Sequence, residues 1–130
     1  MPDIIKISIQ AQILNEWYVV NKLLHANLLL LISILSEVFG STMLKLSNGF
    51  KNLLPVIGII FGYAVAFYTL SLSLKTIPLG MAYAIWSGLG TALTALIGIV
   101  LFKEGFNSKK LMGLILIIGG VILLNIEVPY

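Results

Sequence analysis

Four apolar runs, each long enough to cross a membrane, constrain this 130-residue sequence more than any other feature. The hydrocarbon core of a bilayer is about 30 Å thick, and about 20 residues of α-helix can cross it. The runs cover about 27–46, 54–74, 79–102 and 111–126. The links between them are too short to contain a separate domain. The sequence therefore predicts an all-α membrane protein whose four transmembrane helices form one bundle.

Charged residues are scarce in this chain, at 10% of all positions against 59% that are hydrophobic. A soluble domain carries about a quarter charged residues to cover its surface, so membrane lipid must cover most of this protein instead. The lysines lie at the edges of the runs and form no basic stripe that would bind nucleic acid. The sequence has no cysteine, no cluster of metal ligands, no phosphate-binding loop and no serine, histidine and acid set. We therefore expect no metal, no cofactor and no enzymatic activity.

Residues 1–26 differ from the four runs because they mix charged and amide side chains with isoleucines. Large apolar residues recur there every four positions, a spacing typical of an amphipathic helix that lies in the membrane interface. These residues are Ile5, Ile9, Ile13 and Trp17. A disordered leader is an equal alternative, whereas a signal peptide is not favoured, since the following apolar run contains a glutamate. At the other end of the chain, residues 127–130 form a short tail.

Glu37 is the one ionisable residue inside an apolar run, and it lies near the middle of that run. A charge at this depth costs roughly 2.5 to 3.5 kcal/mol on insertion scales, so such residues usually face the bundle interior and have a function there. Residues on the same side of the helix, at steps of three and four, are mostly small or apolar. They are Leu30, Ser33, Ile34, Gly40 and Ser41. Small residues leave space for a ligand beside the carboxylate, but they also permit close helix packing around a neutral glutamic acid. The first run alone leaves both interpretations open.

Aromatic residues lie at membrane depth in the second and third runs. Tyr83 and Trp86 share one face of the third run, although tryptophan in membrane helices usually gathers at the interface. Tyr63 in the second run is either a packing residue or a site residue. Gly88 and Gly90 weaken the helix just after Trp86 and favour a hinge there.

A carboxylate beside aromatic rings attracts a large, weakly hydrated cation, because the ring faces add cation-π attraction to the charge. The same carboxylate can hold a proton, so that proton and cation would compete for one site. Four helices are too few to enclose such a site, so two or more chains must assemble. Gly113 and Gly120 lie seven residues apart on one face of the fourth run, which is typical of a close contact between helices.

These residues together resemble the small multidrug resistance family. The resemblance covers about residues 26–126 and rests on residues 36–45, Tyr63, residues 78–88, and the pair Gly113 and Gly120. It implies a multi-pass protein of the inner (cytoplasmic) membrane, an antiparallel dimer that exports lipophilic or quaternary ammonium cations in exchange for protons. The site residues implied are Glu37 for proton and substrate; Leu30, Ser33, Ile34, Gly40 and Ser41 as its lining; Tyr63, Tyr83 and Trp86 as an aromatic wall; Gly88 and Gly90 as the hinge; and Gly113 and Gly120 as the dimer contact.

The family resemblance also bears on the branch and on the leader. Guanidinium exporters of the family carry a tryptophan three residues after the glutamate, where this chain has Gly40, so the multidrug branch is favoured. Family members usually begin close to Leu23 or Leu24, so transport should not depend on residues 1–22. Export of small cations such as guanidinium or polyamines is the alternative within transport. A subunit that only packs into a larger membrane complex is the alternative of another class.

Lysines are distributed unequally between the two ends of the predicted bundle. The first and third links contain Lys45, Lys51, Lys103, Lys109 and Lys110, whereas the second link and the flank before the first run contain Lys75 and Lys22. The positive-inside rule places the first and third links in the cytoplasm and both termini outside. A family member that inserts in both orientations would have nearly balanced lysines, so this asymmetry favours a heterodimer with an oppositely oriented homologue. A homodimer is the alternative.

Overall fold

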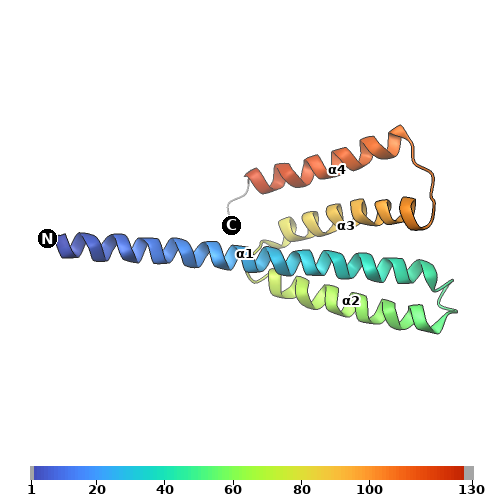
Figure 1. Ribbon diagram of the computed structural model, residues 1–130, viewed down its shortest axis with the longest axis horizontal. Helices are drawn as coiled ribbons and strands as arrows, with labels where there is room; N and C mark the ends of the chain where they lie inside the picture. The colour runs from blue at the N-terminus through green and yellow to red at the C-terminus, as the bar shows by residue number, and fades with distance from the viewer. Residues whose placement is uncertain (1, 128–130) are drawn as a thin grey trace.

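The structure, a computed structural model, describes residues 2–127, and these form four α-helices (Figure 1). The helices are α1 (Pro2–Leu46), α2 (Leu53–Ser73), α3 (Leu79–Leu101) and α4 (Ser108–Glu127). Each is long and apolar enough to cross a membrane, and residues 2–127 contain no β-strand. The predicted all-α architecture with four membrane spans is therefore confirmed. Most of the predicted tail, residues 128–130, lies outside the described residues.

Helix α1 is much longer than the predicted first span. It continues without a break through residues 2–26 and extends beyond the rest of the bundle (Figure 1). No glycine follows Pro2 until Gly40, and a proline in the first turn is compatible with a helix, so nothing in this stretch ends the helix near residue 26. Residues 2–22 are all exposed, and the first buried residue is Ala26, at 2% exposure. In this structure residues 2–22 are therefore continuous with the first span and make no part of the core.

Helices α1 and α2 form a hairpin whose backbones approach closely. A Cβ atom added to Gly62 would lie 3.0 Å from the Cα of Gly40, so glycine at both positions sets the distance between the helices. The buried hydroxyl of Ser33 donates a hydrogen bond of 2.7 Å to the carbonyl oxygen of Ala66 across the same seam. Small residues and an interhelical hydrogen bond are what stabilise helix pairs in lipid.

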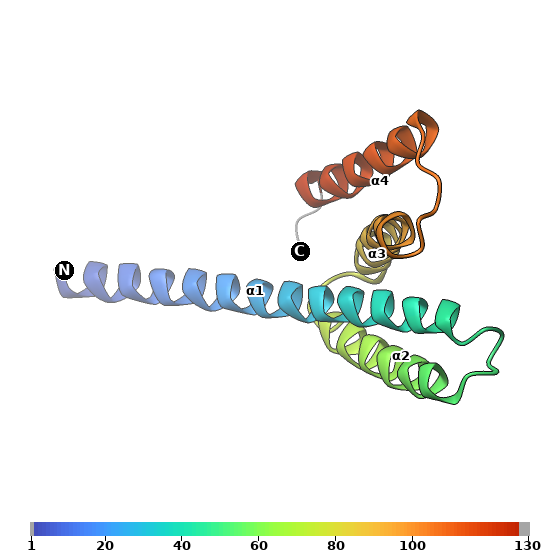
Figure 2. The same cartoon turned by 45° about the vertical axis from the view of Figure 1, so that its right-hand side comes forward.

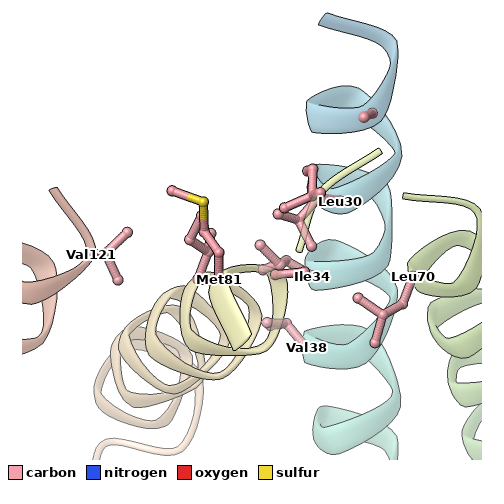
Figure 3. Close-up of a cluster of buried hydrophobic side chains, with 10 residues drawn as sticks. Leu30, Ile34, Val38, Leu70, Met81 and Val121 are labelled. Carbon is pink, nitrogen blue, oxygen red and sulfur yellow. The ribbon is translucent and has the colours of Figure 1, made fainter. Parts of the chain in front are cut away.

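The apolar core lies where α1 meets α2 and α3. Leu30, Ile34 and Val38 lie on the side of α1 that faces Met81 of α3 (Figure 3). Leu70 of α2 and Val121 of α4 belong to the same buried cluster, with Val121 beyond Met81. Most other apolar side chains are exposed, as expected for surfaces that face lipid.

The four helices are not equally enclosed. Helix α1 contacts both α2 and α3, whereas α4 contacts α3 and lies at the outside (Figure 2). The links from α1 to α2 and from α3 to α4 lie at one end of the bundle, and the link from α2 to α3 lies at the other (Figure 1). The lysine-rich links are therefore on the same side, and α4 leaves most of its surface free.

Candidate functional site

A cavity of about 490 Å³ opens beside Glu37, between α1 and α3, and extends to the end of the bundle that holds the lysine-rich links. Its wall combines Trp86 with a set of polar side chains. The polar and charged lining residues are Glu37, Ser41, Thr42, Lys45, Ser87, Thr91, Thr94 and Glu104. Glu37 itself is half-buried. A carboxylate at membrane depth thus faces a space large enough for a small organic molecule.

The Glu37 carboxylate is held by a chain of hydroxyl groups. Ser41 donates a hydrogen bond of 2.6 Å to Oε1 of Glu37, and the Ser41 oxygen lies 2.9 Å from the hydroxyl of Tyr63. A serine hydroxyl has one proton to donate, so Tyr63 must donate to Ser41 when Ser41 donates to an ionised Glu37. If Glu37 carries a proton, the direction of both bonds can reverse. The chain therefore accepts either state of the carboxylate and ties α1 to α2.

Gly90 provides the space for the second carboxylate oxygen. A Cβ atom at Gly90 would lie 2.9 Å from Oε2 of Glu37, which is closer than van der Waals contact. Gly88 has a different neighbour, since a Cβ atom there would lie 2.8 Å from Cγ2 of Val121 in α4. Helix α3 is continuous through both glycines. The hinge at Gly88 and Gly90 stays a prediction. In this structure the lack of a side chain at Gly90 makes room for the carboxylate of Glu37.

A row of aromatic rings runs from α2 to α3. Ring centroids are 6.4 Å apart for Tyr63 and Phe67, 5.8 Å for Phe67 and Trp86, and 5.6 Å for Trp86 and Tyr83. These separations are typical of attractive aromatic pairs. Trp86 lines the cavity, and its buried Nε1 has no hydrogen-bond partner among the described residues. The structure thus brings the three predicted aromatic residues together, with Phe67 as the link between them.

Other predicted lining residues lie in helix contacts of the single chain. Leu30 and Ile34 belong to the apolar core, and Ser33 uses its hydroxyl on Ala66. Gly40 lies against the ring of Tyr63, where a Cβ atom would be 3.0 Å from Cδ2. None of these four is part of the cavity lining described above.

Sequence reasoning missed several residues of the cavity wall. Ser87, Thr91 and Thr94 had a signal, since polar residues at steps of four and three mark one face of an apolar helix. Phe67 belongs to the aromatic row and not to the cavity lining, and its signal was that it follows Tyr63 by one helical turn. Lys45 and Glu104 gave none, because 59 positions separate them in the sequence and only the fold brings them together.

The two glycines of the predicted dimer contact differ in exposure: Gly120 is exposed, whereas Gly113 is half-buried and lines a smaller cavity of about 330 Å³ beside Ala95 and Ile99 of α3. Added Cβ atoms at Gly113 and Gly120 would meet nothing within 4 Å. Both positions are therefore open to close approach by another helix.

Four membrane-spanning helices, with a carboxylate and a tryptophan ring in a cavity between α1 and α3, define a multi-pass protein of the cell membrane. A model of the family described as Small Multidrug Resistance protein matches residues 25–117. The chain belongs to the small multidrug resistance family, as the sequence motifs predicted.

Three relatives illustrate its position in that family. The multidrug resistance protein EbrB of Bacillus licheniformis is 66% identical over 93 residues, which are 72% of this chain and 78% of the relative. The multidrug resistance protein EbrA of Bacillus atrophaeus is 53% identical over 96 residues, 74% of this chain and 91% of the relative. The quaternary ammonium compound-resistance protein QacH of Staphylococcus saprophyticus is 47% identical over 98 residues, 75% of this chain and 92% of the relative.

Proposed function

We propose that this protein exports lipophilic and quaternary ammonium cations across the cell membrane in exchange for protons. The observation that carries the proposal is the carboxylate of Glu37, which faces a cavity at membrane depth beside the ring of Trp86. A negative charge and an aromatic face together favour cations that shed water easily. The names of the relatives, which refer to multidrug and quaternary ammonium resistance, support the same substrate class. The proposal assigns transport and no enzymatic activity.

Exchange follows from the use of one carboxylate for two ligands. A protonated Glu37 has no charge to attract a cation, and a bound cation leaves no room for the proton. The hydroxyl chain through Ser41 and Tyr63 supports both states, since its hydrogen bonds can reverse direction. If the cavity opens to one side of the membrane at a time, each release of a cation must be matched by uptake of protons.

A second chain completes the site in this proposal. The cavity lies open in the single chain, and α4 presents Gly113 and Gly120 on a surface with space for another helix. Relatives named EbrA and EbrB both match this chain, which supports pairing with a homologue as well as with a second copy. The lysine-rich end faces the cytoplasm by the positive-inside rule, and the partner lies in the opposite orientation.

Proton release tests the proposal directly. Tetraphenylphosphonium added to the purified protein in weakly buffered detergent should acidify the solution, because the cation displaces protons from Glu37. We expect release either from the chain alone, which indicates a homodimer, or only after addition of an oppositely oriented homologue. If guanidinium releases protons and tetraphenylphosphonium does not, the site belongs to a small-cation exporter. Release by neither cation, with or without the homologue, would contradict the proposal and favour a packing subunit.

Removal of residues 2–22 should leave transport unchanged. All of these residues are exposed, and the match to the family begins at residue 25. The measurement is the concentration of tetraphenylphosphonium that stops growth of cells producing the shortened or the full-length chain, at equal protein levels in the membrane. A loss of resistance at equal levels would show that the extension takes part in transport.

A further inference from the structure

The mouth of the cavity holds a second carboxylate and a second aromatic ring. Glu104, in the link after α3, and Phe102, at the end of α3, both line the same cavity as Glu37. Lys45 occupies the position between them: its Nζ lies 3.1 Å from Oε1 of Glu104 and 5.1 Å from the centre of the Phe102 ring. The mouth of the cavity therefore combines a carboxylate with an aromatic ring, as the interior does with Glu37 and Trp86. At the mouth, the ammonium group of Lys45 already contacts both.

We propose that Glu104 and Phe102 form a second binding site for organic cations, which Lys45 fills in the empty transporter and which an incoming cation takes by displacing the Lys45 ammonium. This inference rests on the function proposed above. It adds a capture step before the cation reaches Glu37, which lies roughly 12 Å deeper along α1 at 1.5 Å per residue.

The contact of Lys45 is weak enough to be exchanged. The side chains of Lys45 and Glu104 are 55% and 42% exposed, and an ion pair with this much access to water contributes little to stability. An organic cation with apolar substituents loses less hydration than an ammonium group when it meets a ring face. A lipophilic cation is therefore a better ligand for the Glu104 and Phe102 pair than Lys45 is.

Glu104 keeps its place without Lys45, because the backbone holds it. Lys103 has a φ of +54°, which turns the chain back over the last turn of α3, and the backbone N–H of Glu104 donates a hydrogen bond of 3.1 Å to the carbonyl oxygen of Gly98. The carboxylate lies directly against Gly98, where an added Cβ atom would be 2.5 Å from Oε2. The site is thus preformed, which lowers the cost of binding.

The position of this pair also fits capture from the cytoplasm. It lies at the end of the bundle with the lysine-rich links, which the positive-inside rule places in the cytoplasm. A cation that is to be exported meets Glu104 before it meets Glu37.

The test separates the mouth from the interior by removing Glu37. Equilibrium dialysis with labelled tetraphenylphosphonium is carried out on the native chain and on three full-length variants. The single variant carries Glu37→Gln, the double variant adds Lys45→Met, and the triple variant adds Glu104→Gln to both. We expect the double variant to bind about fivefold more tightly than the single variant, and the triple variant to lose that gain. The triple variant also measures partition of the cation into detergent. Phe102→Leu in the double variant should weaken binding, because it removes the ring face and keeps an apolar side chain.

Lys51→Met in the Glu37→Gln variant is the matched control, since Lys51 carries the same charge at the same end of the bundle but does not line the cavity. If Lys51→Met raises affinity as much as Lys45→Met, or if Glu104→Gln changes nothing, the mouth site is overturned. Native affinity in the Glu37→Gln variant itself would instead contradict the proposed function. The two failures are therefore distinguishable.

Discussion

Glutamine in place of Glu37 should abolish cation-driven proton release and weaken tetraphenylphosphonium binding by about 100-fold or more. Glutamine has nearly the size of glutamate, and its amide oxygen can accept the hydrogen bond that Ser41 donates to Oε1 at 2.6 Å. It has neither a negative charge nor a proton to exchange. The expected loss is thus chemical and not structural. Titration calorimetry gives the affinity, a pH electrode gives the protons released, and thermal unfolding shows that the fold is retained.

Glu16→Gln is the matched control for this prediction. It makes the same chemical change in the exposed part of α1 that precedes the family match, so proton release and affinity should stay at native values. Native affinity in Glu37→Gln would show that Glu37 only joins two helices. That result would contradict the proposal that the carboxylate of Glu37 binds the cation.

The helices of this protein could be predicted from the sequence because lipid imposes a simple rule. Every span needs about 20 apolar residues, and polar residues must mark the links. The rule does not say where a helix ends outside the membrane. The extension of α1 through residues 2–26 depends on local helix formation and on the lack of a helix-breaking residue, which a span length does not reveal.

The contacts of the site also divide into those within one helix, which the sequence predicts, and those between helices, which it does not. The spacing of four between Glu37 and Ser41 predicted that their side chains share a helix face, and the structure places them in a hydrogen bond. The third member of that chain, Tyr63, depends on the register between α1 and α2, which no local pattern encodes. Ser33 has the spacing of a lining residue, yet the same register turns its hydroxyl to the backbone of α2.

Gly90 also depends on how the helices pack, because it lies in α3 and makes room for the carboxylate of Glu37 in α1. Valine at this position should weaken tetraphenylphosphonium binding about 30-fold, since the loss of a close charge contact in a partly buried site costs about 2 kcal/mol. A Cβ atom at Gly90 would already lie 2.9 Å from Oε2 of Glu37, and the methyl groups of valine would force the carboxylate out of its place. Alanine adds only the Cβ atom, so its effect should be several times smaller. Affinity is measured by titration calorimetry for both variants.

The fold should tolerate this change, because the displaced atoms are the end of a flexible side chain. Gly80→Val in the same helix is the control: an added Cβ atom there meets nothing within 4 Å, so its affinity should be native. A native affinity for Gly90→Val would show that the position of the carboxylate is unimportant. Glu37→Gln removes the charge and keeps its place, whereas Gly90→Val keeps the charge and moves it. A cation site that needs both must fail in each variant, and a helix contact that needs neither should survive both.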